Sequence, residues 1–265
     1  MHRPQIALLD ASHGSPHTRR NFRRELAADV VVFDVTEGEL PADFSFDGCV
    51  VSGSRSSVYW GEEWVHPLST WIEDAHERGL PALGVCFGHQ LLASALGGDV
   101  DAMGEYEIGY REIEHTGESA IFDGVDRRFT AFTTHSDEVV RLPPGAELLA
   151  ENDYSIHAFQ KDDAYGVQFH PEYDVETARE LVDEKDLPAR KRRRVIEGIN
   201  ENNYRASLEA KRVFDNFLKI VGETSVDESV DESVESVVVE ESSVVEGSSV
   251  VEESSAVDES ATVES

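Results

Sequence analysis

A short segment around one cysteine constrains the fold of this chain more than any other. Cys86 stands between Gly84 and Gly88, after the apolar run 81–85 and at the start of a helical pattern. This spacing is the cysteine version of the G-x-S-x-G elbow, in which glycines on either side of the nucleophile relieve crowding in a sharp turn. We therefore expect Cys86 at the end of a strand and at the N-terminus of a helix, which stabilises a thiolate. A small buried structural cysteine is the alternative, and it is our prediction for Cys49.

A histidine and a carboxylate much later in the chain supply the other groups that a nucleophilic cysteine needs. His170 follows the strand-like run 165–169 and precedes a proline, a position that favours extended backbone. In an extended chain Glu172 lies on the same side as His170 and can accept a hydrogen bond from one imidazole nitrogen. The other nitrogen is then free to take the proton of Cys86. The pattern predicts a hydrolytic site of Cys86, His170 and Glu172.

Strand and helix signals alternate along the first half of the chain. Short apolar runs that alternate with amphipathic helices are typical of a parallel sheet covered on both faces. We predict strands over 5–10, 30–33, 48–51 and 81–85, and helices over 17–28, 62–78 (closed by Gly79) and 88–96. In the second half we predict short strands over 108–113, 129–133, 147–150, 156–160 and 165–169, and a helical stretch over 189–221. The expected fold class is α/β, with a mostly parallel sheet, helices on both faces and additional late strands.

The charge of the chain is uneven along its length. The sequence holds 54 acidic and 23 basic residues, a formal net charge of −31. Residues 223–265 contain 14 Asp or Glu and no Lys or Arg, which leaves −17 for residues 1–222. The last 43 residues also lack aromatic residues and proline, and such a segment cannot bury enough surface to offset its chain entropy. We predict one folded domain over 1–222 and an acidic disordered tail over 223–265.

Composition also limits partners and compartment. A body this acidic repels nucleic acid and anionic membranes, so we expect neither as a partner. The 18 Arg against 5 Lys fit a high-salt cytoplasm, although an ordinary acidic protein is the alternative. The apolar runs are too short for a signal peptide or a membrane span. We expect a soluble, cytoplasmic protein.

The remaining composition points to no bound metal. Cys49 and Cys86 fall in different predicted strands, which argues against a disulfide, and the cysteine spacing does not suit a metal. We expect no metal site and no cofactor. The basic cluster 190–194 is predicted to lie in internal ion pairs, with a nucleic-acid or partner contact as the alternative. We expect Trp60, Trp64 and Trp71 to pack in the core, with Tyr59 and Trp60 bordering a substrate mouth as the alternative.

The two motifs resemble the signatures of class I glutamine amidotransferases. The segments 84–90 and 166–172 are similar to those of the GMP synthase-type amidotransferase domain and its free-standing relatives, over about residues 5–175. The resemblance implies a flavodoxin-like three-layer fold and a triad of Cys86, His170 and Glu172. It further implies that Cys86 attacks the side-chain amide of glutamine, releases ammonia and leaves a γ-glutamyl thioester for water to hydrolyse.

Further roles come from the resemblance. It implies that Gln90, Thr134, Ser136 and Asp137 bind the glutamine substrate. The backbone N–H groups of the loop at Gly53 and Ser54 would join that of Phe87 at the oxyanion, a role that the elbow geometry also indicates for Phe87. We assign no role to the other histidines, such as His157, which we expect in loops or on the surface, and only a weak one to His135.

One departure from the family leaves the substrate open. The loop has Gly53-Ser54-Arg55 where the family usually has Gly-Gly-Pro, and similar Gly-Ser loops occur in relatives that resemble γ-glutamyl peptidases. No phosphate-binding P-loop and no ATP pyrophosphatase domain follow, so we expect ammonia to pass to a separate acceptor enzyme. The alternatives are a stand-alone γ-glutamyl hydrolase or peptidase with the same triad and a non-catalytic glutamine-sensing subunit.

Overall fold

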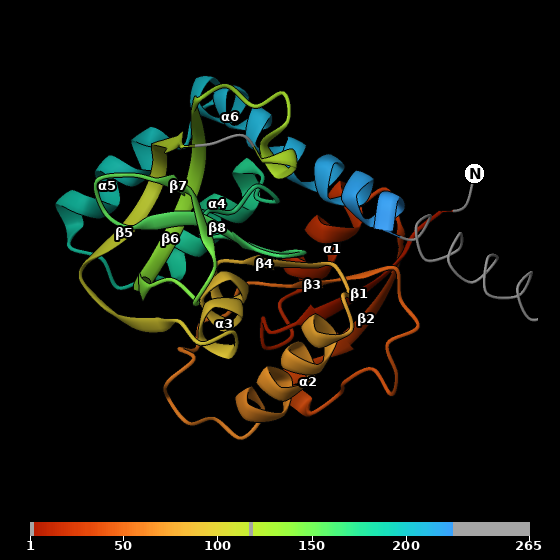
Figure 1. Ribbon diagram of the computed structural model, residues 1–265. Coiled ribbons are helices and arrows are strands. Elements are labelled where there is room, and N and C mark those ends of the chain that lie inside the picture. The colour runs from red at the N-terminus through yellow and green to blue at the C-terminus, as the bar shows by residue number, and fades with distance from the viewer. Residues whose placement is uncertain (1–2, 117–118, 225–265) are drawn as a thin grey trace, which may run out of the picture. The chain divides into compact units, whose positions relative to one another are not determined.

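The computed structural model describes residues 3–116 and 119–224 (Figure 1). Its strands form one nine-stranded sheet in the order β2-β1-β3-β4-β9-β8-β7-β5-β6. The first five strands in this order are parallel: β2 (Asp29–Asp34), β1 (Gln5–Asp10), β3 (Gly48–Val51), β4 (Ala82–Val85) and β9 (Ala164–Val167). The others pair antiparallel: β8 (Ile156–Lys161), β7 (Glu147–Glu151), β5 (Asp99–His115) and β6 (Arg128–Arg141).

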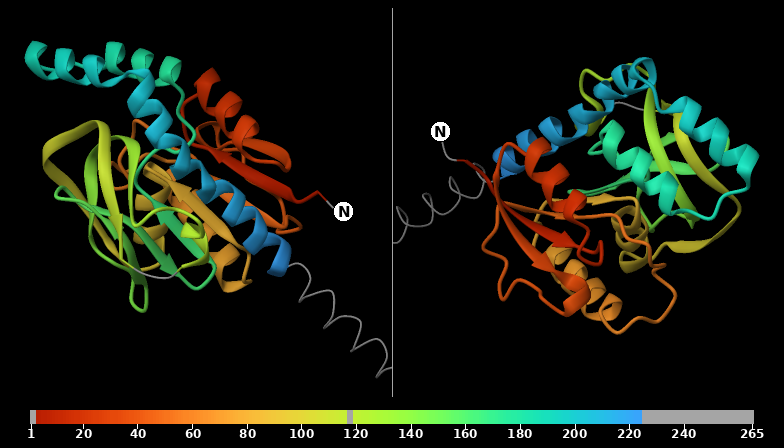
Figure 2. Two further views of the ribbon diagram at one scale, coloured as in Figure 1. Left: turned by 90° about the horizontal axis from the view of Figure 1, so that it is seen from above. Right: turned by 180° about the vertical axis from the view of Figure 1, so that it is seen from behind.

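Alternation along the parallel strands explains why both faces of the sheet are covered. In β1, Ile6 and Leu8 belong to one buried cluster, and Ala7 and Leu9 belong to another. Because successive side chains of a strand point to opposite faces, a strand buried on both sides appears in the sequence as a continuous apolar run. Figures 1 and 2 show α1 (Pro16–Glu25) and the helix over 212–224 on one face, and α2 (Val65–Glu77) and α3 (Phe87–Ala95) on the other. The predicted α/β fold is confirmed.

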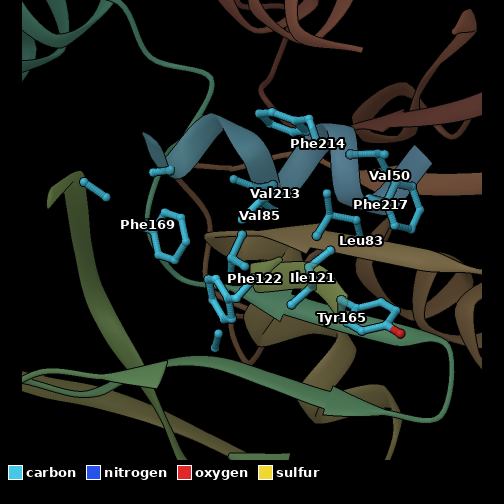
Figure 3. Close-up of a cluster of buried hydrophobic side chains, with 14 of the residues drawn as sticks. Val50, Leu83, Val85, Ile121, Phe122, Tyr165, Phe169, Val213, Phe214 and Phe217 are labelled. Atoms are coloured by element: carbon cyan, nitrogen blue, oxygen red, sulfur yellow. The ribbon is translucent and has the colours of Figure 1, made fainter. Parts of the chain in front are cut away.

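The helix over 212–224 is part of the core. Figure 3 shows Phe214 and Phe217 of this helix above the sheet, beside Leu83 and Val85 of β4. Each phenylalanine side chain is at most 1% exposed, and full burial of such a side chain stabilises the fold by about 1.5–3 kcal/mol. The helix therefore belongs to the same folded domain as the parallel strands.

A third buried cluster joins the segment after residue 172 to the long hairpin of β5 and β6. Ala178 and Val182 of α4 (Val175–Glu184) and Val195 of α5 (Ala189–Gly198) pack with Ile108 of β5 and Phe132 of β6. This packing brings the chain that follows β9 against the strand that carries residues 134–137.

The predicted helical stretch 189–221 is interrupted. It consists of α5, α6 (Glu201–Ser207), the 3-10 turn η3 (Leu208–Lys211) and the helix that begins at residue 212. The break after α5 is stabilised by Asn200, whose side chain accepts hydrogen bonds from the N–H groups of Asn202 and Asn203 and so caps α6. Two further 3-10 turns are η1 (Val35–Glu37) and η2 (Ala120–Phe122).

Strands β5 and β6 extend well beyond the apolar runs 108–113 and 129–133 that predicted them. Their outer parts pair through backbone hydrogen bonds and carry polar side chains, so alternation does not reveal them. Of the predicted tail, residues 223 and 224 still belong to the last helix, and 225–265 lie outside the described residues.

The basic cluster on α5 is only partly paired. Lys191 forms an ion pair with Glu105, and Arg192 with Asp183. Within residues 3–116 and 119–224, no ion pair involves Arg190, Arg193 or Arg194, so the expectation of internal pairing was wrong for these three.

In the same part of the chain, no helix has the length and apolar character needed to cross a membrane.

Candidate active site

The turn between β4 and α3 has the geometry predicted from its glycines. Cys86 has φ 54° and ψ −102°, a strained conformation for a residue with a side chain. A Cβ atom at Gly84 would lie 2.3 Å from the carbonyl oxygen of Gly88, and one at Gly88 would lie 2.3 Å from that of Val51. Both positions therefore require glycine, because the turn packs backbone against backbone there.

Three neighbouring strands bring their carboxyl ends to this turn. Gly53 follows β3, Cys86 follows β4 and His170 follows β9, and these strands are adjacent in the sheet. A Cβ atom at Gly53 would lie 3.6 Å from the Cβ atom of Cys86 and 3.0 Å from Cε1 of His170. The three residues thus meet at one point, at the edge of a parallel sheet where ligands commonly bind.

Three contacts fix the position of His170, two through its ring and one through its backbone. Its Nδ1 atom lies 2.8 Å from Oε1 of Glu172, and its ring stacks on that of Tyr173 with centroids 4.1 Å apart. Its backbone N–H donates to the carbonyl oxygen of Phe132. Its Nε2 atom is buried and has no hydrogen-bond partner among the described residues. That nitrogen is available for proton exchange on the side of Cys86.

The electrostatic surroundings favour the protonated form of His170. Burial acts against the charge, but the negative groups of Glu172 and Cys86 outweigh it and raise the pKa of His170 to about 10. Burial, followed by the same two negative charges, raises the pKa of Tyr173 well above its ordinary value, so its ring stays neutral beside the imidazole.

One of two adjoining cavities contains most of the residues expected to bind substrate. Phe87, Gln90, Thr134, Ser136 and Asp137 line it together with Cys86. Nε2 of Gln90 donates to the backbone oxygen of Asp137 and to Oε1 of Gln168, at 3.0 Å in both cases. Both amide hydrogens of Gln90 are therefore used, and its Oε1 atom is left to accept a hydrogen bond from a ligand.

The other polar groups of this cavity are also fixed. The Asp137 carboxylate accepts hydrogen bonds from the hydroxyl groups of Ser57 and Tyr59. The hydroxyl groups of Thr134 and Tyr106 lie 2.6 Å apart. A carboxylate so held at the wall of a narrow cavity suits an ammonium group.

The second cavity opens on the His170 side of Cys86 and has a volume of about 590 Å³. Gly53, Ser54, Cys86, Thr134 and His170 are among the residues that line it, together with Ser12, His13 and His17. Arg55 and Lys185 line both cavities. Within the described residues Arg55 takes part in no ion pair, so its charge is available to a carboxylate. Glu172 lies behind His170 and lines neither cavity.

Some functional candidates were missed because no local pattern marks them. Ser57, Tyr106, Tyr173 and Lys185 come from four separate segments and meet only in the fold. The expectation for His157 was wrong, because it is 0% exposed.

Outcomes at the other aromatic and thiol positions are mixed. Trp71 packs in the core as expected, whereas Trp60 is 59% exposed. The hydroxyl group of Tyr59 donates to the Asp137 carboxylate at 2.9 Å, but Tyr59 is not among the residues that line the cavity. Cys49 is buried, and burial raises the pKa of its thiol to about 12, in keeping with a structural role.

Comparison with known proteins shows the family to which this chain belongs. The family model of class I glutamine amidotransferases matches residues 8–185. The glutamine-hydrolysing GMP synthase of Aromatoleum aromaticum is 34% identical over 165 residues, which cover 58% of this chain and 30% of that protein. The GMP synthase of Aliivibrio fischeri (strain MJ11) is 35% identical over 179 residues, which cover 65% of this chain and 33% of that protein. The chain thus spans about a third of the length of these curated relatives.

Solved structures share the fold. A glutamine amidotransferase from Thermotoga maritima superposes with a TM-score of 0.68 at 20% identity, covering 82% of this chain and 99% of that one. The glutamine amidotransferase from Methylobacillus flagellatus gives a TM-score of 0.69 at 23% identity, covering 82% and 94%. With the family model matched over more than half of its length, this chain belongs to the class I glutamine amidotransferase family.

Proposed function

We propose that this protein hydrolyses the side-chain amide of glutamine through Cys86, His170 and Glu172 and supplies the ammonia to a separate acceptor enzyme. The observation that carries the proposal is the meeting of Cys86, His170 and Gly53 at one point, with Glu172 2.8 Å behind the imidazole. This is the arrangement that a thiolate nucleophile with an oriented acid–base partner requires.

In the first half of the reaction the thiolate of Cys86 attacks the side-chain carbon of glutamine. Negative charge develops on the amide oxygen, and the N–H groups of Ser54 and Phe87, which have no acceptor among the described residues, are proposed to stabilise it. The proton on Nε2 of His170 passes to the leaving nitrogen. The C–N bond breaks, ammonia leaves, and the γ-glutamyl group remains on sulfur as a thioester.

In the second half a water molecule replaces ammonia. His170 takes a proton from the water as its oxygen attacks the thioester carbon, and the C–S bond breaks to return the thiolate. Glutamate leaves, and Glu172 holds the imidazole orientation throughout. The balance is glutamine plus water to glutamate plus ammonia.

The substrate is proposed to lie with its glutamyl part in the cavity of Gln90 and Asp137. The carboxylate of Asp137 would hold the α-ammonium group, and Oε1 of Gln90 would accept from a ligand N–H. Arg55 and Lys185 line both cavities and carry positive charge, so they are proposed to bind the α-carboxylate. We also propose that the chain consists of one folded domain over about 1–222 and an acidic tail after it, although residues 223 and 224 still belong to the last helix.

The test is a direct comparison of substrates on the purified protein. We expect glutamine to yield equimolar glutamate and ammonia, and Cys86 to gain the mass of one γ-glutamyl-type adduct from a glutamine-analogue diazoketone. Cleavage of γ-glutamyl dipeptides with negligible release of ammonia from glutamine would contradict the proposal and identify the stand-alone peptidase. A native protein that reacts with neither substrate nor diazoketone would instead fit the sensing subunit.

The charge state of His170 gives a second prediction. Its Cε1–H resonance should titrate near pH 10 in the native protein, and at lower pH in Cys86→Ala, because one of the two negative groups that raise its pKa is gone. Since the folded-state pKa is raised, protonation of His170 stabilises the fold fully below about pH 6.5, and this contribution is lost as pH rises through about 10. NMR titration of both proteins measures the shift, and an unchanged pKa in the variant would show that Cys86 carries no charge beside His170.

A further inference from the structure

A network of buried polar side chains adjoins the cavity of Gln90 and Asp137, and His135, one of its members, is among the residues that line this cavity. Glu107 of β5 is 0% exposed. Its carboxylate accepts hydrogen bonds from Nε2 of His135 at 2.7 Å, from Nε2 of His157 at 3.2 Å and from Nδ2 of Asn152 at 2.8 Å. Nε of Arg111 lies 3.6 Å from the same carboxylate. A buried carboxylate with this many donors is ionised.

The charge of Glu107 follows from its partners. Burial alone would raise the pKa of Glu107, but the hydrogen bonds that His135 and His157 donate to its carboxylate hold this pKa well below its usual range. His157 behaves as a neutral donor, because burial lowers its pKa despite the neighbouring carboxylate. The carboxylate of Glu107 therefore accepts a hydrogen bond from both imidazole rings.

The hydrogen-bond geometry of His135 determines its charge. Its Nε2 atom faces the Glu107 carboxylate, and its Nδ1 atom lies 2.9 Å from the backbone oxygen of Asp137. Both of these oxygens can only accept, so both ring nitrogens carry a hydrogen. His135 and Glu107 form an ion pair that is buried from solvent on both sides.

A metal ion offers a different explanation for the same cluster. Single donor atoms of Glu107, His135 and His157 lie within 4.8 Å of one another. Ligand atoms around tetrahedral zinc, each about 2.1 Å from the ion, stand about 3.4 Å apart. The 2.7 Å between His135 and Glu107 is instead a direct hydrogen bond, so the two share a proton.

This ion pair reaches the substrate cavity through one carbonyl group. The backbone oxygen of Asp137 accepts from His135 at 2.9 Å and from Gln90 at 3.0 Å, which uses both of its lone pairs. Because a carbonyl oxygen can only accept, the NH₂ of Gln90 must face it, and Oε1 of Gln90 must point elsewhere. Glu107 and His135 thereby fix both the residue that would bind the ammonium group and the orientation of the Gln90 amide.

We propose that Glu107 and His135 are positioning residues for the glutamyl group, acting through the backbone of Asp137 and the side chain of Gln90. The proposal rests on the glutaminase function proposed above. Neither residue touches the reacting atoms, so their loss should weaken recognition of the glutamyl group and leave the thiolate of Cys86 intact.

Two substitutions at His135 separate the two contacts of its ring. In His135→Gln the amide nitrogen stands near the former Nε2 and keeps the contact with Glu107, but the donor to Asp137 is lost. In His135→Asn the amide nitrogen stands near the former Nδ1 and keeps the donor to Asp137. We expect His135→Gln to react about tenfold more slowly with the diazoketone and to raise KM for glutamine by a similar factor, as for one lost hydrogen bond of about 1.4 kcal/mol. His135→Asn should stay within about threefold of the native protein on both measures.

The rate of alkylation by iodoacetamide tests whether a substitution has damaged the fold around Cys86. It alkylates the Cys86 thiolate without using the glutamyl cavity, so its rate should stay within about twofold in every variant. Glu107→Gln removes the carboxylate but keeps an oxygen that can accept from His135, and the contact of His135 with Asp137 remains. It should therefore show a smaller loss with the diazoketone than His135→Gln. His157→Gln is the matched control, because it can still donate to Glu107. The ring of His157 packs edge-on against that of His135, but its side chain forms no hydrogen bond with residues 134–137, so the variant should behave as the native protein.

The outcomes that overturn the proposal are distinct. If His135→Gln and His135→Asn lose diazoketone reactivity equally, or if neither loses it, the link through Asp137 does not position substrate. If iodoacetamide and diazoketone rates fall together, the cluster only maintains the fold. If the purified native protein contains one equivalent of zinc, a metal ion and not a shared proton joins Glu107 to His135, and the proposal is wrong. A native protein that fails to react with diazoketone while alkylating normally contradicts the glutaminase function itself.

Discussion

Cys86→Ala should lower glutaminase turnover by about 10⁴-fold or more, the scale seen when the nucleophile of a triad is removed. The alanine cannot form a thioester, and no other thiol lines either cavity, since the second cysteine, Cys49, is buried in β3. Binding of glutamine should persist, because Gln90, Asp137 and their partners are unchanged. Release of ammonia measures turnover, and calorimetric titration with glutamine measures binding.

The second cysteine provides a matched control. Cys49 is fully buried in β3 on the face covered by α2 and α3, so Cys49→Ala removes a thiol without touching the site. We expect native turnover in that variant. Wild-type activity in Cys86→Ala, or its loss in Cys49→Ala, would place the nucleophile elsewhere.

Gly84→Ala should destabilise the protein by about 3 kcal/mol or more, at or above the upper end of the usual cost of overpacking. The new Cβ atom would lie 2.3 Å from the carbonyl oxygen and 2.4 Å from the carbonyl carbon of Gly88, and 2.7 Å from the backbone nitrogen of His89. These are backbone atoms of the first turn of α3 and cannot rotate away. Relief requires moving α3 from β4, which would also displace Cys86.

Chemical denaturation measures the effect, as a lower midpoint at unchanged slope. Gly198→Ala is the control, because a Cβ atom at Gly198, the last residue of α5, would have nothing within 4 Å. We expect that change to leave the free energy of unfolding within about 0.5 kcal/mol of the native value. A Gly84→Ala protein as stable as the native one would mean that the turn is looser than the contacts at Gly84 require.

The sequence predicted the parts of the fold that repeat a local rule. Strands β1 and β3 have the bounds predicted for them, because a strand buried on both faces is marked by a continuous apolar run such as 6–9 in β1. The end of α2 was marked by Gly79, whose φ of +72° suits the residue after a helix. The break at Asn200 was missed, because helical periodicity continues across it and only a capping hydrogen bond reveals it.

The same division holds at the site. The elbow glycines and the His170–Glu172 pair were visible because each depends on neighbours within a few residues. The hydrogen bonds to the Asp137 carboxylate were not visible in the sequence, since their donors, Ser57 and Tyr59, lie about 80 residues away in the chain. Nor was the buried contact between Glu107 and His157, which lie 50 residues apart in the chain and would have been placed on the surface by polarity alone.

By itself the sequence determined the α/β class, the rigid mount of Cys86 and the pairing of His170 with Glu172, because short-range sterics and strand periodicity fix all three. Tertiary structure alone decided which polar residues line the cavity of Gln90 and Asp137 and which buried residues adjoin it. A buried charge is tolerated only where partners from distant segments satisfy it, and those of Glu107 come from β6, from β8 and from the residue that follows β7, which the sheet brings together.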